Sequence, residues 1–273
     1  MSARLMLDGK VAVVTGAASG IGRAIARSMA ARGCDVAIAD INEAGLAETA
    51  GLIGDAVRVT CHRVDVADRS AVARFPDEVA AAHGVVDVVI NNAGVALAGT
   101  FAQLTEAEFD WLLEINLQGV VRMTRAFLPV LERRPQAQIV NLSSLFGLIA
   151  PPGQSAYAAA KFAVRGFSEA LRHELEAAGS PVGVSVVHPG GVRTGIATNA
   201  RAAAAVDAVE AARQQAHFQK VLRLDADQAG EIIVRGIERR QPRILVGQDA
   251  KLVAVIERPM PVGYWHIIGR RRG

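Results

Sequence analysis

The stretch TGAASGIG, residues 15–22, follows a short β-branched run, Val11–Thr15, and opens a segment with apolar residues at helical spacing. Its three glycines let the backbone turn sharply and approach a ligand closely. A helix that begins at such a turn offers unpaired N–H groups and its positive dipole end to an anion. We therefore expect a strand–turn–helix unit that cradles a pyrophosphate. A glycine triplet alone is weak evidence, because many such turns contain glycine, and the flanking elements carry the argument.

The same alternation of β-branched runs and helical stretches continues along the chain. One helical stretch carries Ile21, Ile25 and Met29, with Gly33 expected as its C-cap. Strands that alternate with helices form parallel sheets with right-handed crossovers. We predict an α/β, doubly wound Rossmann fold with a seven-stranded parallel sheet, order 3-2-1-4-5-6-7, and helices on both faces. The predicted strands are Val11–Thr15, Val36–Ala39, Val57–Cys61, Val86–Ile90, Gln138–Leu142, Val182–Val187 and Arg243–Val246.

The composition is that of a globular chain with a large core. Of 273 residues, 51% are hydrophobic and 21% are charged, and no repeat, linker or composition change marks a boundary. We expect a single domain over residues 1–273. The net charge is +3, and Arg270–Arg272 alone supply three positive charges. Basic residues elsewhere alternate with acidic ones, so no nucleic-acid partner is expected.

The two cysteines, Cys34 and Cys61, each lie in an apolar, strand-like run. We expect both to be buried free thiols, and no metal is expected because companion ligands at short spacing are lacking. Residues 1–10 lack the apolar core of a signal peptide, and no stretch reaches the roughly 18 apolar residues of a membrane span. These features predict a cytoplasmic protein.

One acidic residue, Asp40, ends the second predicted strand. A carboxylate there accepts hydrogen bonds from the adenosine ribose hydroxyls and repels a 2′-phosphate. No Arg or Lys lies between Gly16 and Gly22, and Ile41 follows Asp40. NAD is therefore favoured over NADP. The alternative is that Asp40 only caps the next helix, as Asp residues do.

A second constellation is Tyr157 and Lys161 on a predicted helix, where i, i+4 spacing places both on one face. A free tyrosine has a pKa near 10, and a neighbouring ammonium together with a positively charged nicotinamide lowers it. Tyr157 can then exchange a proton with an alcohol or carbonyl oxygen. The motif alone is weak, because a solvated pair has the same spacing.

Polar residues at neighbouring strand ends strengthen this interpretation. Ser144 ends the fifth predicted strand, and Asn92 ends the fourth, at the edge where sites form in this fold. A hydroxyl at this edge can hydrogen-bond the substrate oxygen. Asn116 lies within a predicted helix, where Asn is a poor helix former, so a site role and a buried structural hydrogen bond both remain open.

Together these residues resemble the short-chain dehydrogenase/reductase family from about Leu7 to about Val246. The resemblance rests on TGxxxGIG, NNAG at residues 91–94, the tetrad positions, YxxxK, and Pro189-Gly190, in order and at family-like spacing. It implies a catalytic tetrad of Asn116, Ser144, Tyr157 and Lys161.

In such a tetrad Tyr157 is the acid/base and Ser144 orients the substrate. Lys161 anchors the ribose and modulates the phenol, and Asn116 holds a water that links Lys161 to solvent. Asp65 and Val66 are implied at the adenine. The implied cofactor contacts are Gly16, Ser19, Gly20, Ile21, Gly22, Asp40, Asp65, Val66, Asn92, Ala93, Gly94, Tyr157, Lys161, Pro189, Gly190, Val192 and Thr194.

The chain departs from this family at its end. Many members close with Asp-Gly-Gly after the last strand, whereas here the strand reads Arg243–Val246, followed by Gly247. The usual tetrameric interface is therefore in doubt, and we expect a homo-oligomer that is a dimer or a tetramer. The tail, residues 248–273, has no implied role. Its aromatic, aliphatic and basic residues suit weak contact with an anionic membrane surface, contact with a partner subunit, or a packed or frayed terminus.

Specificity is expected from two apolar stretches. Residues 145–152 lie between Ser144 and Tyr157, and residues 95–97 follow the NNAG turn; neither contains Arg or Lys. They favour a hydrophobic secondary alcohol or ketone, although both could simply pack the core. Residues 195–224 depart from the strand–helix rhythm and are either a substrate lid or a surface helical excursion.

The sequence thus predicts a NAD-dependent oxidoreductase with Tyr157 at its centre. Two rival hypotheses are a non-catalytic NAD-binding regulatory protein, since some folds keep the nucleotide site and lose the chemistry, and a lipid-associated protein acting through the tail.

Overall fold

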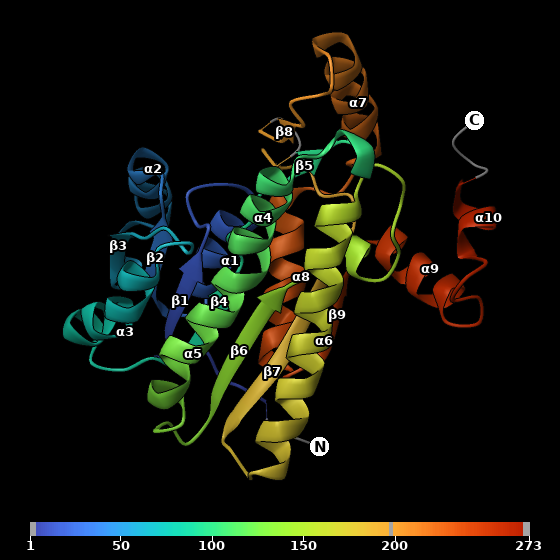
Figure 1. The fold of residues 1–273 in the computed structure, drawn as a ribbon. Coiled ribbons are helices and arrows are strands. Elements are labelled where there is room, and N and C mark those ends of the chain that lie inside the picture. Colours follow the sequence, from blue (N-terminus) through green and yellow to red (C-terminus); the bar gives the residue numbers. More distant parts are fainter. Residues whose placement is uncertain (1–3, 197–198, 270–273) are drawn as a thin grey trace.

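The computed structural model describes residues 4–196 and 199–269. Seven parallel strands form one sheet in the order β3-β2-β1-β4-β6-β7-β9 (Figure 1). Counted within this sheet alone, the order is the predicted 3-2-1-4-5-6-7, so the predicted fold is confirmed. The strands are β1 Val11–Thr15, β2 Asp35–Asp40, β3 Val59–Arg63, β4 Val88–Asn91, β6 Ala137–Leu142, β7 Val182–Pro189 and β9 Arg243–Val246.

Helices cover both faces of the sheet (Figure 1). Because all seven strands are parallel, their carboxyl ends share one edge, and the loops that leave this edge build the candidate site. The α-helices are α1 Gly20–Ala30, α2 Glu43–Ile53, α3 Arg69–His83, α4 Glu106–Leu113, α5 Gly119–Leu131, α6 Ser155–Ala177, α7 Ala208–Val221, α8 Ala226–Glu238, α9 Gln248–Glu257 and α10 Tyr264–Ile268.

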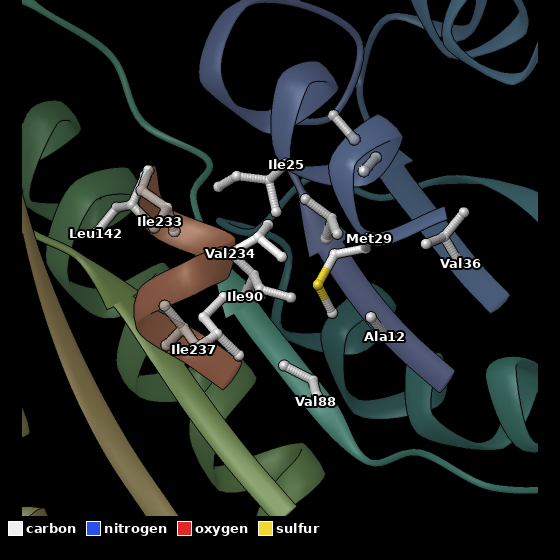
Figure 2. Close-up of a cluster of buried hydrophobic side chains, with 14 of the residues drawn as sticks. Ala12, Ile25, Met29, Val36, Val88, Ile90, Leu142, Ile233, Val234 and Ile237 are labelled. Atoms are coloured by element: carbon white, nitrogen blue, oxygen red, sulfur yellow. The ribbon is translucent and has the colours of Figure 1, made fainter. Parts of the chain in front are cut away.

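The core is divided by the sheet into two apolar layers. On one face, Ile25 and Met29 of α1 and Ile233 of α8 pack on the strands, as Figure 2 shows. Alternation along the strands sends Val13 to the opposite face, where α3, α5 and α6 pack. There Phe127 meets Phe75 edge to face, with ring centroids 5.4 Å apart. Burial on both faces explains why the central strands read as continuous apolar runs.

Several local predictions were wrong, and β4 begins at Val88 rather than Val86. The edge strand β3 begins at Val59 rather than Val57, and Cys61 on it is exposed, whereas Cys34 is buried as expected. An edge strand has a neighbour on one side only, so its side chains are covered less completely. Helix α1 ends at Ala30 with Ala31 as its C-cap. Gly33 instead takes the left-handed turn that follows, at φ +77°.

Two segments lie outside the main sheet. In residues 195–224, β8 (Arg201–Ala202) pairs in parallel with β5 (Leu97–Ala98), and α7 follows beyond the carboxyl edge (Figure 1). After β9, α9 and α10 form the described part of the tail, at the side of the molecule in the same view. Arg270–Arg272 lie outside the described residues. None of the helices in residues 4–196 and 199–269 is long and apolar enough to cross a membrane.

Candidate active site

The glycine turn after β1 is closed so tightly that no side chain fits at Gly16 or Gly22. Gly16 and Gly20 have φ values of +65° and +54°, which favour glycine. A Cβ atom added at Gly22 would lie 2.1 Å from the carbonyl oxygen of Gly16. Ser19 is the N-cap of α1 with an extended backbone, and its hydroxyl makes no capping hydrogen bond. The first N–H groups of α1 are therefore not capped by that side chain, as an anion site requires.

Thr15 and Asn92 bind this turn to the end of β4. The Asn92 amide Nδ2 donates to the carbonyl oxygens of Thr15 (2.9 Å) and Gly16 (3.1 Å). In return Thr15 Oγ1 accepts from the backbone N–H groups of Asn92 (3.0 Å) and Ala93 (3.1 Å). These four bonds place the NNAG turn beside the glycine turn. Thr15 was part of the motif that predicted the turn but had no predicted role of its own, because a threonine that ends a buried strand carries no further signal.

Asp40 lies against the glycine turn. Its carboxylate accepts from the backbone N–H groups of Ala18 (3.1 Å) and Asn42 (3.0 Å). Asn42 rather than Asp40 caps α2, since its side chain accepts from Gly45 N (3.0 Å). The capping alternative for Asp40 is therefore wrong, and the carboxylate is placed at the cofactor turn.

The residues implied at the adenine lie at the end of the neighbouring strand. Asp65 follows β3 and accepts from the Ala67 N–H (2.9 Å). Val66 is buried and contacts α5 so closely that a Cβ atom at Gly119 would lie 2.8 Å from Val66 Cγ2. Asp65 and Val66 are thus fixed beside the ends of β2 and β3.

Tyr157 and Lys161 share one face of α6, as expected. The Lys161 Nζ lies 5.6 Å from the centroid of the Tyr157 ring and donates to the Leu142 carbonyl oxygen (3.0 Å). Lys161 is 4% exposed, and burial lowers its pKa to about 8. Burial raises the pKa of the half-buried Tyr157 phenol, and the Ser144 hydroxyl lowers it by a smaller amount. The lowering of the phenol pKa that the sequence predicts from Lys161 together with a bound nicotinamide therefore stays a prediction.

Ser144 follows β6 at the same edge, within reach of the Tyr157 phenol. Its Oγ accepts from the Phe146 N–H (3.1 Å), and its carbonyl oxygen accepts from His188 Nδ1 (2.9 Å). His188 is fully buried at the end of β7, and burial lowers its pKa to about 4, so the ring is neutral at pH 7. Its Nε2 has no hydrogen-bond partner among the described residues. His188, which the sequence pattern does not link with the site, is thus connected to it through Ser144.

Asn116 lies in a π-helical turn, Glu114–Gln118, between α4 and α5. Its amide accepts from Val95 N (2.8 Å) and donates to Val95 O (2.9 Å), so it makes the buried structural bonds that the sequence analysis weighed against a site role. It also lies at the site. A Cβ atom at Gly94 would lie 3.1 Å from Asn116 Oδ1 and 3.6 Å from Lys161 Nζ. π-turns of this kind are frequent at functional sites.

The loop after β7 completes the edge. Pro189 ends the strand, and Gly190 and Val192 follow it. Thr194 returns to the glycine turn, where a Cβ atom at Gly20 would lie 3.1 Å from Thr194 Cβ. Of the four residues that the resemblance implies at the nicotinamide end, Thr194 is therefore the one brought into contact with the glycine turn.

In the apolar stretch after Ser144, some side chains contact the site and others pack against the tail. Phe146 stands edge-on to Tyr157, with ring centroids 6.1 Å apart. Leu148 and Ile149 are buried in a cluster with Val253 of α9. The core-packing alternative therefore describes Leu148 and Ile149, and the expectation of a substrate surface stays a prediction for the partly buried Leu145 and Phe146.

Comparison with known proteins agrees with this geometry. The family model described as short chain dehydrogenase matches residues 10–205. SadH of Mycobacterium tuberculosis, named as an oxidoreductase, is 44% identical over 263 residues, which cover 96% of this chain and 94% of SadH. A short chain dehydrogenase/reductase from Burkholderia phymatum in complex with NAD superposes with a TM-score of 0.86 at 32% identity, covering 93% of this chain and 95% of that one.

A metagenomic short-chain oxidoreductase in complex with NADP superposes with a TM-score of 0.72 at 30% identity, covering 89% of this chain and 98% of that one. The solved neighbours thus include both nicotinamide cofactors. The chain belongs to the short-chain dehydrogenase/reductase family, whose members are oxidoreductases.

Proposed function

We propose that this chain transfers a hydride between NAD and a hydrophobic secondary alcohol or ketone, with Tyr157 as the acid/base. The observation that carries the proposal is the convergence of Tyr157, Lys161, Ser144 and Asn116 beside the glycine turn. A nicotinamide cofactor fits the residues present, because Gly16 and Gly22 let the turn close against Asn92, the start of α1 has no side-chain cap, and Asp40 lies against the turn. When bound, the nicotinamide ring accepts or supplies the hydride.

The chain's own groups then divide the remaining work. The Tyr157 phenol takes the proton of an alcohol or returns one to a carbonyl oxygen. Ser144 supports this step by donating a hydrogen bond to the substrate oxygen and orienting it. A protonated Lys161 favours the phenolate electrostatically, and Asn116 keeps the NNAG turn against Lys161 through Val95.

Replacement of Tyr157 by phenylalanine tests the role of the phenol. Because only one oxygen is removed, we expect the fold and NADH binding to persist while turnover falls by about 100-fold or more, the range for a general acid/base. NADH absorbance over a panel of alcohols and ketones measures turnover, and NADH fluorescence measures binding. Undiminished turnover of a confirmed substrate by Tyr157→Phe would remove Tyr157 from its role.

The preference for NAD over NADP is proposed from Asp40. A carboxylate at the ribose repels a 2′-phosphate, so we expect calorimetry to give tighter binding of NAD than of NADP. In Asp40→Ala we expect the ratio of the two dissociation constants to shift towards NADP by about tenfold, the equivalent of one charge-assisted hydrogen bond. An Asp40→Ala ratio equal to that of the wild type would contradict the assignment.

The two rival functions receive less support. A protein that only binds NAD needs no Tyr–Lys pair at the site, and the buried Lys161 ammonium is costly to keep. For lipid association through the tail, Val253 and Tyr264 are docked on the protein itself, which leaves exposed apolar side chains, Val255 and Val262 among them, that could contact a membrane surface.

A further inference from the structure

The described tail, α9 and α10, follows the stretch that the family model matches, residues 10–205. Two of its side chains accept hydrogen bonds from backbone N–H groups of loops at the carboxyl edge. We propose that Asp249 and Tyr264 are positioning residues: Asp249 fixes the loop at the nicotinamide end, and Tyr264 fixes the loop that follows Ser144. This inference rests on the proposed function, because the two loops matter only if cofactor and substrate meet there.

Asp249 lies directly on the loop after β7. Its Oδ2 accepts from the Gly191 N–H at 2.6 Å, and its Oδ1 accepts from the Ala250 N–H at 2.9 Å. A Cβ atom added at Gly190 would lie 2.1 Å from Asp249 Oδ1. The carboxylate therefore occupies the space that a side chain at residue 190 would need. A charged acceptor at this distance makes one of the stronger kinds of hydrogen bond.

The opposite side of Gly191 is bonded to the end of the 195–224 segment. Its carbonyl oxygen accepts from the N–H groups of Arg223 (2.8 Å) and Leu224 (3.0 Å). Leu224 also forms a parallel bridge with Val192, and its carbonyl oxygen accepts from the Arg193 N–H (2.8 Å). Gly191 is thus bonded to the tail by its N–H and to the candidate lid by its carbonyl. Loss of the Asp249 carboxylate therefore removes the hydrogen bond to the Gly191 N–H and leaves the bonds to the Gly191 carbonyl oxygen in place.

Gly191 lies three residues before Thr194, whose side chain packs against Gly20 of the glycine turn. A shift of Gly191 therefore moves residues that are implied at the nicotinamide end. The contact between Gly191 and Asp249 joins residues 58 positions apart. The pairing of β7 with β9 brings the two segments together as far as Gly190, whose N–H donates to the Val246 carbonyl oxygen (2.9 Å), and the Asp249 carboxylate extends this connection to Gly191.

Tyr264 makes the corresponding contact on the substrate side. Its hydroxyl oxygen accepts from the Ala150 N–H at 3.0 Å. Its ring joins the cluster in which Leu148 and Ile149 are buried, with Phe146 among the partly buried members. Because Phe146 stands edge-on to Tyr157, the Tyr264 contact restrains the loop that borders the proposed acid/base.

The test compares Asp249→Ala and Tyr264→Phe in the full chain, with Asp227→Ala as the control. Asp227 is an exposed carboxylate on α8 that pairs with Arg27 at 2.9 Å and touches neither loop. For Asp249→Ala we expect the NADH dissociation constant to rise about tenfold, with little change in the substrate KM. Asp249→Asn keeps an acceptor oxygen and should recover most of the affinity.

For Tyr264→Phe we expect the opposite division: the NADH dissociation constant stays constant and the substrate KM rises severalfold. Hydrogen exchange of the peptide that contains Gly191 gives a readout without cofactor, and it should accelerate in Asp249→Ala alone. Asp227→Ala should match the wild type in all three measurements.

Each outcome separates the hypotheses. Wild-type NADH affinity and wild-type exchange in Asp249→Ala would overturn the inference while leaving the proposed function intact. Parallel loss of cofactor affinity, substrate KM and melting temperature in both variants would show a general structural role and would also overturn it. If the wild-type chain binds no NADH, the proposed function is overturned, and the inference falls with it. Faster hydrogen exchange at Gly191 in Asp249→Ala would in that case show only that Asp249 holds the loop.

Discussion

Replacement of Lys161 by methionine should make the protein more stable and inactive. The Lys161 ammonium is buried and donates a hydrogen bond to the Leu142 carbonyl oxygen. Burial lowers its pKa from 10.5 to about 8, which means that the native state opposes the charge that the proposed chemistry uses. Methionine has a similar length and no charge, so it should fill the same space without that cost.

The size of the effect follows from the pKa. A fall from 10.5 to about 8 corresponds to about 3 kcal/mol that the charged lysine costs the native state at pH 7. The variant leaves the Leu142 carbonyl without its donor, which costs about 1 kcal/mol. We therefore expect Lys161→Met to raise the free energy of unfolding by about 2 kcal/mol at pH 7.

The difference in stability between Lys161→Met and the wild type should change with pH in a defined direction. Below pH 8 the lysine is protonated in both states, so the native state carries the full cost. Between pH 8 and 10.5 the native lysine loses its proton while the unfolded one keeps it, so the wild type gains stability relative to Lys161→Met. The advantage of the variant should therefore shrink as the pH rises and be nearly gone at pH 10.

The assay is urea unfolding of the cofactor-free proteins at pH 7, 8.5 and 10. Lys220→Met on α7 is the matched control, because Lys220 is exposed and the same substitution there should change stability by less than about 0.5 kcal/mol. A Lys161→Met protein that is less stable than the wild type at pH 7, or whose difference from it does not narrow by pH 10, would refute the reasoning.

Three further predictions concern other parts of the molecule. Gly22→Ala should lower the free energy of unfolding by about 1–3 kcal/mol and weaken NADH binding, because its Cβ would lie 2.1 Å from the Gly16 carbonyl oxygen. The wild type should lose about 3 kcal/mol relative to His188→Leu as the pH falls from 6.5 to 4, because burial lowers the pKa of His188 to about 4 and opposes its protonation. A thiol reagent should label exposed Cys61 in the native chain and reach buried Cys34 only on unfolding.

Calorimetry and chemical unfolding check the first prediction, unfolding curves at several pH values check the second, and mass spectrometry of labelled peptides checks the third. The reasoning about the glycine turn fails if Gly22→Ala binds NADH as the wild type does. That about His188 fails if the two proteins lose stability in parallel down to pH 4. Equal labelling of both thiols in the native chain would contradict the burial of Cys34.

Much of this fold could be predicted because its signals are local. The strand β1 was predicted with its observed bounds, since a buried β-branched run between turn residues is distinctive. The start of the edge strand β3 and the end of α1 were less predictable, because they depend on neighbours that are distant in sequence, although the other edge strand, β9, was predicted with its observed bounds.

Some residues of the candidate site could likewise be predicted from local spacing, and others could not. Tyr157 and Lys161 lie on one helix, so their proximity follows from spacing alone. Thr15, His188 and Asp249 contact partners that are distant in sequence. The separations are 78, 44 and 58 residues, respectively. Their residue types are common in strands and loops, and no pattern in one sequence links them. The pairing of β5 with β8 was missed for the same reason, because two-residue strands carry no periodicity.

The stacking of Arg201 on Trp111 has a practical consequence. The guanidinium of Arg201, on β8, lies 3.9 Å from the centroid of the Trp111 ring on α4. The chain has two tryptophans, and the other, Trp265, lies on α10 beside Tyr264. One indole therefore touches the segment over the carboxyl edge and the other belongs to the tail. With Trp265 replaced by phenylalanine, the emission of Trp111 becomes a built-in optical signal for β8 lifting from the body of the protein, readable in stopped flow without any attached dye.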